Sequence, residues 1–63
     1  MKHAHNPEHL RILIVDDHAI VREGLIRILQ SAHRGWSVQE AGDGHQALEL
    51  LRQSAFDLLI VDL

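Results

Sequence analysis

The clearest pattern in the chain is an unbroken apolar run from Ile12 to Val15, which follows Arg11 and ends in two acidic residues. A strand with one covered face alternates apolar and polar residues, whereas a continuous apolar run is typical of a parallel sheet with both faces covered. A similar run, Leu58 to Val61, again ends in an aspartate. We therefore predict two buried parallel strands, 11–15 and 58–61.

Between these runs, apolar residues recur at helical spacing in a segment that begins at Ala19. The predicted inward stripe consists of Val21, Gly24, Leu25, Ile28, Leu29 and Ala32. Ile26 lies off this stripe, so it is interpreted as a surface isoleucine or as part of a partner-docking face. Asp17 is predicted to cap the start of this helix, and Arg34-Gly35 to close its end.

A short strand is predicted from Trp36 to Ala41, in which the single tryptophan is interpreted as a packing residue. Asp43 and Gln46 then stand three residues apart, which is the spacing of a capping box at a helix N-terminus. We therefore predict a second helix from about Gly44 to Gln53, ahead of the final strand.

The order strand, helix, strand, helix, strand is typical of an α/β fold with a parallel sheet. If both terminal runs are covered on both faces, the two helices must lie on opposite faces of the sheet. With right-handed crossovers, this requires strand 11–15 in the middle and gives the strand order 2-1-3. The switch point, where open α/β sheets bind ligands, then lies at the carboxyl ends of strands 11–15 and 58–61.

Length and composition narrow the class of protein. The 63 residues form at most one domain, and without cysteine there is no disulfide and no cysteine-based zinc site. A net charge of −3 argues against a nucleic-acid surface, and no apolar run approaches the roughly 20 residues of a membrane span. Residues 1–9 are polar and are interpreted as a mobile leader, and we expect a cytoplasmic protein.

The candidate chemistry lies at the predicted switch point, where Asp16, Asp17 and Asp62 converge. Neighbouring carboxylates repel one another, so a cation is expected between them. Oxygen ligands with a few waters suit Mg²⁺, which commonly bridges a carboxylate and a phosphoryl oxygen. Asp16 and Asp17 are therefore candidate metal ligands. Asp62, alone on its strand, is the candidate acceptor of a phosphoryl group and a third metal ligand.

Each of these residues also has a plainer interpretation. An Asp pair after a strand is often a helix cap with a solvated neighbour, and His18 is interpreted as a first-turn helix residue without a chemical role. Asp57 and Glu40 are expected to face solvent. A nucleotide hydrolase is disfavoured because no G-x-x-x-x-G-K loop follows the first strand.

Taken together and in order, the segments ILIVDDH, VREGL, EAGDGHQALELL and FDLLIVDL closely resemble the receiver domain of bacterial two-component response regulators. DDHAIVREGL resembles the subfamily with a C-terminal helix-turn-helix output domain. The resemblance implies a truncated flavodoxin-like fold, with Asp16 and Asp17 as the Mg²⁺-binding pair and Asp62 as the phosphorylated aspartate. It also implies a histidine kinase as partner, and a signalling role rather than an enzymatic one.

The resemblance covers residues 10–63, the N-terminal half of a receiver. The hydroxyl residue, lysine and metal-binding carbonyl that the family uses are absent from this half, so we expect weak Mg²⁺ binding and poor phosphorylation. Strand 58–61 becomes a sheet edge, and we expect self-association through it, with the dilute monomer largely unfolded. The alternative is a structural or self-associating fragment whose acidic pocket carries no phosphoryl chemistry.

Overall fold

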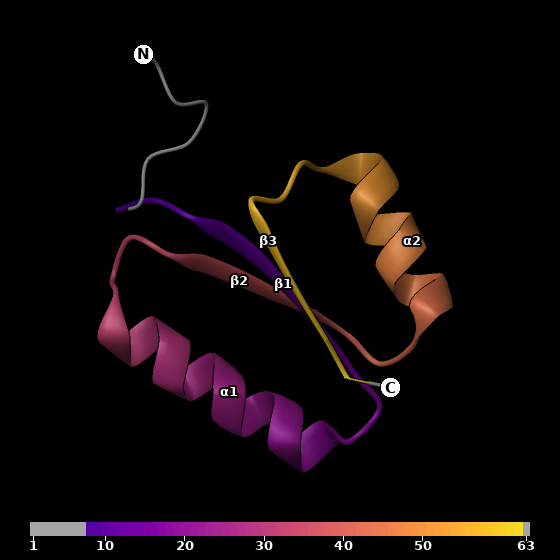
Figure 1. The fold of residues 1–63 in the computed structure, drawn as a ribbon, viewed down its shortest axis with the longest axis horizontal. Coiled ribbons are helices and arrows are strands. Elements are labelled where there is room, and N and C mark those ends of the chain that lie inside the picture. The colour runs from indigo at the N-terminus through magenta and orange to yellow at the C-terminus, as the bar shows by residue number, and fades with distance from the viewer. Residues whose placement is uncertain (1–7, 63) are drawn as a thin grey trace.

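The computed structural model describes residues 8–62, so the expected leader, residues 1–9, lies outside the described residues except for Glu8 and His9. Its elements follow the predicted order (Figure 1). They are β1 (Arg11–Asp16), α1 (Ala19–Ala32), β2 (Ser37–Ala41), α2 (Gly44–Gln53) and β3 (Leu58–Asp62). Neither described helix is long and apolar enough to cross a membrane.

The three strands form one parallel sheet in the order β2-β1-β3, which confirms the predicted α/β fold and strand order. Arg11 lies opposite Ser37 on β2, and Ile12 lies opposite Leu58 on β3. At the other end of the sheet, Asp16 is in register with Asp62. The carboxyl ends of β1 and β3 are therefore level with each other.

The two helices lie on opposite sides of the sheet (Figure 1). One face of β1 packs in a cluster with α2, formed by Leu13, Val15, Ala41 and Ala47 together with Leu50 and Phe56. Ile12 and Ile14 are also fully buried, and because side chains alternate along a strand they point to the other face. That face is covered by α1, which packs against β1 and β2. The central strand is thus enclosed on both faces.

β3 does not share this burial, and the prediction of a buried strand 58–61 was wrong. Leu59 is 45% exposed and Val61 is 55% exposed. Among the described residues, β3 pairs with β1 but neither helix packs against it. An apolar strand is buried only where another layer overlies it. β3 is therefore a sheet edge, as expected, with two exposed faces.

The start of β3 is nevertheless fixed by two contacts between Asp57 and Arg11. The backbone N–H of Asp57 donates to the Arg11 carbonyl oxygen at 2.7 Å, and the Arg11 N–H donates to Asp57 Oδ2 at 2.8 Å. Asp57 is exposed, as predicted. These bonds set the register that brings Asp62 level with Asp16.

The inward face of α1 differs from the predicted stripe. Val21 and Ile28 are half or more exposed, whereas Ile26, interpreted as a surface or docking residue, is half-buried. The side chains that turn inward are those of Arg22, Leu25, Ile26 and Leu29. Because α1 covers only β1 and β2, the flank that carries Val21 and Ile28 extends beyond the strands beneath it.

The predicted N-terminal cap of α2 was confirmed, whereas the predicted caps of α1 were wrong. At α2, Asp43 Oδ1 accepts from the Gln46 N–H at 2.8 Å, which confirms the predicted cap. The Gln46 side chain reaches back one residue further than a standard capping box, where Oε1 accepts from the Gly42 N–H at 2.8 Å. Both bonds satisfy donors at the start of α2 and explain its well-predicted boundary.

At α1 both predicted caps were wrong. The N-cap is His18, not Asp17, and α1 ends at Ala32 with His33 as its C-cap. His33 is extended, its N–H donates to the Leu29 carbonyl oxygen at 3.1 Å, and its ring stacks on Trp36 at 4.3 Å between centroids. This stacking favours an early exit from the helix, before Arg34 and Gly35 are reached.

Candidate functional site

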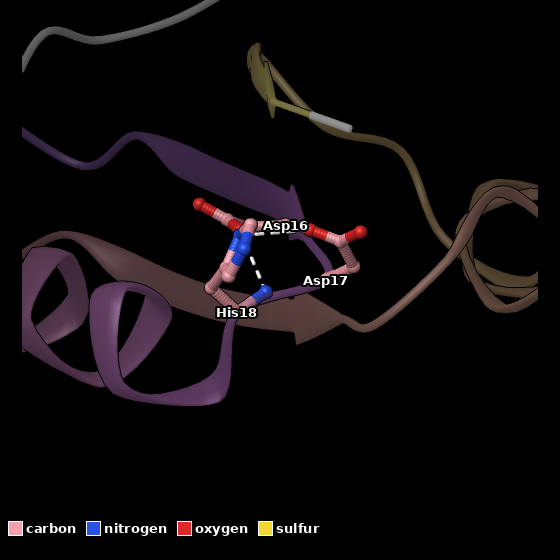
Figure 2. Close-up of side chains that lie close together, drawn as sticks. All are labelled: Asp16, Asp17 and His18. Atoms are coloured by element: carbon pink, nitrogen blue, oxygen red, sulfur yellow. Dashed lines mark hydrogen bonds and ion pairs between the residues drawn. The ribbon is translucent and has the colours of Figure 1, made fainter.

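The acidic residues that follow the first apolar run lie at the carboxyl end of β1, where the chain turns into α1. Asp16 is the last residue of β1, and Asp17 and His18 form the connection to α1. Their ligand atoms, one from each residue, all lie within 4.8 Å of one another. Figure 2 shows the His18 ring between the two carboxylates. We call these three residues the β1 cluster.

Asp16 is the buried member of the β1 cluster, with only 1% of its side chain exposed. Its Oδ1 accepts from the His18 N–H at 2.8 Å and lies 3.3 Å from His18 Nδ1. Its Oδ2 is buried and has no hydrogen-bond partner among the described residues. Burying a carboxylate oxygen without a partner is unfavourable. A cation beside Asp16 would remove this penalty, so the site fits Mg²⁺ on its own geometry.

His18 is the member of the β1 cluster whose role was missed in the sequence. Its Nδ1 lies 2.9 Å from Asp17 Oδ1, and both side chains are largely exposed. His18 was interpreted as a first-turn helix residue, but it is the N-cap of α1, and its ring links the two acidic residues. The available signal was its position directly after the Asp pair, where a helix cap turns its side chain back toward the strand end.

Asp62, the third predicted site residue, lies beside Asp16 but outside the β1 cluster. The two residues are register partners on adjacent parallel strands, which are spaced about 4.8 Å apart. In-register residues of a parallel pair point to the same face of the sheet. The Asp62 side chain is exposed, in contrast to that of Asp16. The fold thus brings the two acidic strand ends together while leaving one carboxylate accessible.

Arg22 holds the end of β1 in place from the first turns of α1. Its Nη1 donates to the Asp16 carbonyl oxygen at 2.6 Å, and its Nε donates to Glu40 Oε1 at 2.6 Å. Glu40 is exposed, as predicted, but its carboxylate is engaged in this ion pair. Arg22 therefore ties together β1, β2 and α1 and places a positive charge near the acidic residues.

Comparison with known proteins identifies a family whose sequence profile matches this chain. The sequence profile of the response regulator receiver domain matches residues 12–63. Over 56 residues the chain is 39% identical to the "Probable transcriptional regulatory protein NarL" of Mycobacterium tuberculosis. It is 36% identical over 53 residues to the nitrate/nitrite response regulator protein NarP of Escherichia coli, and 45% identical over 53 residues to the response regulator MprA of Mycobacterium leprae.

These alignments cover most of this chain but a small part of each relative. They span 89% of the chain for NarL, and 84% for NarP and MprA. They cover 26%, 25% and 22% of those proteins, so the chain spans about a quarter of their length. No solved structure gave a significant match.

Proposed function

The chain belongs to the response regulator receiver domain family, and from this premise we propose that Asp62 accepts a phosphoryl group from a histidine kinase in the intact parent protein. The observation that carries the proposal is the register of β1 and β3, which sets Asp62 beside Asp16 at the switch point of the sheet. The β1 cluster supplies the acidic residues for a metal, and the exposure of Asp62 leaves its carboxylate accessible to a donor.

In the proposed reaction, an oxygen of Asp62 attacks the phosphorus of a phosphohistidine. The N–P bond breaks as the O–P bond forms, and the nitrogen leaves with the bonding pair and takes up a proton from solvent. Asp16, Asp17 and Asp62 are the residues that would hold Mg²⁺, which neutralises phosphoryl charge when bound. The chain acts as a phosphoacceptor in a signalling relay, with no catalytic turnover of its own.

We further propose that the 63-residue chain, tested by itself, binds Mg²⁺ weakly and is phosphorylated poorly. The supporting observation is that few positively charged side chains are available to compensate a phosphoryl group on Asp62. Lys2 is the single lysine of the sequence, and Arg22 already binds Glu40 and the Asp16 carbonyl oxygen. An aspartyl phosphate on Asp62 would therefore depend on the metal for most of its charge compensation.

Acetyl phosphate with Mg²⁺, followed by intact-mass measurement, tests both statements. We expect slow, partial addition of one phosphoryl group, and no addition to Asp62→Asn. Equal addition to Asp62→Asn would contradict the role of Asp62. Rapid, complete addition that depends on Asp62 would contradict only the proposed deficiency. Metal binding is measured by Mg²⁺ titration of the unmodified chain and of a double variant, Asp16→Asn with Asp17→Asn. Identical titration curves would favour the alternative, a structural fragment whose acidic residues carry no phosphoryl chemistry.

A second proposal concerns self-association through β3. Its outer edge carries backbone N–H and C=O groups available for pairing, and Leu58, Leu59 and Val61 are exposed along it. Such an apolar edge is a template for strand pairing with a second copy. We expect a dimer or larger assembly at high concentration and loss of structure on dilution, measured by sedimentation and circular dichroism. A compact monomer with a cooperative thermal transition would contradict this expectation.

The family assignment supports a cytoplasmic site of action for the parent protein. NarL is named as a transcriptional regulatory protein, which supports transcription control through a separate output region of the parent. We propose no direct DNA contact by the residues of this chain, because its net charge of −3 disfavours binding to a phosphate backbone. Electrophoretic mobility of a DNA duplex with excess chain provides the test, and no shift is expected.

A further inference from the structure

His18 is placed to do more than cap α1. Building on the proposed metal site, we propose that His18 Nδ1 is a metal ligand beside Asp16 and Asp17, and that it shifts the preference of this site from Mg²⁺ toward first-row divalent ions such as Mn²⁺ and Co²⁺. His18 is then a specificity-determining residue for the ion.

The distances within the β1 cluster match those between ligands of one small ion. Adjacent ligands of an octahedral ion with bonds of about 2.1 Å are separated by roughly 3.0 Å. His18 Nδ1 lies 2.9 Å from Asp17 Oδ1 and 3.3 Å from Asp16 Oδ1. Nδ1 thus lies at about the spacing of neighbouring coordination positions from each of the two carboxylate oxygens, and all three ligand atoms lie within 4.8 Å of one another.

Two features hold His18 in this position. Its backbone N–H donates to Asp16 Oδ1 at 2.8 Å, which fixes the residue against the buried carboxylate. Its carbonyl oxygen accepts from the Arg22 N–H at 2.9 Å in the first turn of α1. Because a carboxylate oxygen only accepts, Nδ1 carries the ring proton in its contact with Asp16 and Asp17. A bound ion would replace this proton at Nδ1, and Nε2 of the largely exposed ring would carry the proton in contact with water. Coordination through Nδ1 therefore requires no burial of a protonated nitrogen.

Asp16 Oδ2 has no hydrogen-bond partner within residues 8–62, and this observation is independent of the histidine. A carboxylate that is 1% exposed and has one unsatisfied oxygen is poorly compensated by the hydrogen bonds on its other oxygen. It favours a positively charged ligand at this end of β1. The β1 cluster therefore combines the buried carboxylate of Asp16, the exposed carboxylate of Asp17 and the nitrogen donor of His18.

The nitrogen donor decides which ion is preferred. Mg²⁺ strongly favours oxygen ligands, whereas imidazole nitrogen suits later first-row ions, whose affinity rises along the series from Mn²⁺ to Co²⁺. Two carboxylates alone would bind these ions with modest discrimination. Adding His18 increases the affinity for Co²⁺ and, less strongly, for Mn²⁺, with little effect on Mg²⁺.

The experiment is a set of metal titrations on the full chain, in a background with His3, His5 and His9 replaced by alanine. This background removes the imidazoles of the N-terminal segment that would compete for metal. Co²⁺ binding is followed by visible absorption, Mn²⁺ binding by the electron paramagnetic resonance signal of the free ion, and Mg²⁺ binding by competition against Mn²⁺. His18→Ala is compared with His18→Asn, which retains a favoured N-cap residue, and with His45→Ala as a matched control on α2.

We expect both His18 variants to weaken Co²⁺ binding on the order of tenfold or more, with Mg²⁺ binding changed by less than about threefold. His45→Ala should leave both affinities unchanged. Unchanged Co²⁺ affinity in the His18 variants, or an equal loss for Co²⁺ and Mg²⁺, would overturn the inference. Absence of any Mg²⁺ binding in the unmodified chain would instead contradict the proposed Mg²⁺-dependent function, so the two failures are distinguishable.

Discussion

The two apolar strands that end in aspartate have nearly the same sequence and opposite environments. Ile12–Asp16 reads ILIVD and Leu58–Asp62 reads LLIVD, and they are paired residue by residue. The first is enclosed by both helices and by a strand on each side, and its side chains are buried. The second has a neighbour on one side and exposed side chains, and neither helix of the described residues 8–62 packs against it. Burial here is a property of position in the sheet.

The same contrast separates the two aspartates that close the strands. Asp16 is buried and, within the part of the chain that the structure describes, one of its oxygens has no hydrogen-bond partner, which suits an ion ligand held in place by the fold. Asp62 is exposed, which suits a group that must meet a phosphoryl donor. The difference between an enclosed and an open strand therefore supports the two different roles proposed for these aspartates.

The largest expected effect comes from truncating equivalent leucines in the two strands. Leu13→Ala removes a fully buried side chain from the cluster with α2 and should destabilise the fold by about 2–5 kcal/mol. Leu59→Ala, at its register partner, should cost under about 1 kcal/mol because much of that side chain already contacts water. Urea unfolding of both variants at one chain concentration measures the difference, and equal losses would contradict the contrast.

A smaller effect is expected from the residue that ties down the end of β1. Arg22→Ala removes the bonds to Glu40 and to the Asp16 carbonyl oxygen and should destabilise the chain by about 1–2 kcal/mol. Arg27→Ala, an exposed change on the same helix, should stay within about 0.5 kcal/mol. Thermal unfolding compares the two, and a loss in Arg27→Ala as large as that in Arg22→Ala would show that the bonds of Arg22 are not the cause.

Replacing each of the two aspartates by asparagine should have different effects on stability. Without divalent ions, Asp16→Asn removes a poorly compensated buried charge while retaining its shape, and should stabilise the fold by about 1 kcal/mol. Asp62→Asn should leave stability unchanged because its carboxylate is hydrated. Denaturant titration in a chelator checks both. Destabilisation by Asp16→Asn would show that its charge is already compensated in the folded chain.

The last comparison concerns the open strand at Val61, and its readout is the association of copies of the chain. Val61→Lys places a charge on the open strand, where the side chain is 55% exposed, and should disfavour pairing between copies. Sedimentation should show a smaller assembly than the unmodified chain forms at equal concentration. Glu49→Lys, on the exposed surface of α2, is the matched control for added charge and should retain the assembly.

The fold was predictable from the sequence to a greater extent than its packing. Strand order followed from two apolar runs and right-handed crossovers, although the assumed double coverage of the second run was wrong. The boundary of α2 was predictable because Asp43 and Gln46 satisfy its first donors locally. The inward face of α1 was not, because Arg22 turns toward the sheet through partners distant in sequence.

In the candidate site, the proximity of the strand ends was also more predictable than the local side-chain contacts. Asp16 and Asp62 were predictable as neighbours because strand ends in a parallel sheet meet at one edge, and the register places them together. The contact of His18 with both carboxylates depends on the conformation of a two-residue connection, which periodicity does not specify. The burial that leaves Asp16 Oδ2 without a partner depends on the surrounding layers, which the apolar run alone does not place.

The central claim, that Asp16, Asp17 and Asp62 share one divalent ion, is tested most directly by paramagnetic broadening of amide signals. Mn²⁺ is added in small amounts to isotopically labelled chain, at a concentration where it is folded, and Mg²⁺ is then added in excess. We expect the amide signals of residues 16–18 and of Asp62 to broaden first and together, and Mg²⁺ to restore them. Broadening at residues 16–18 while the Asp62 amide stays sharp would contradict it.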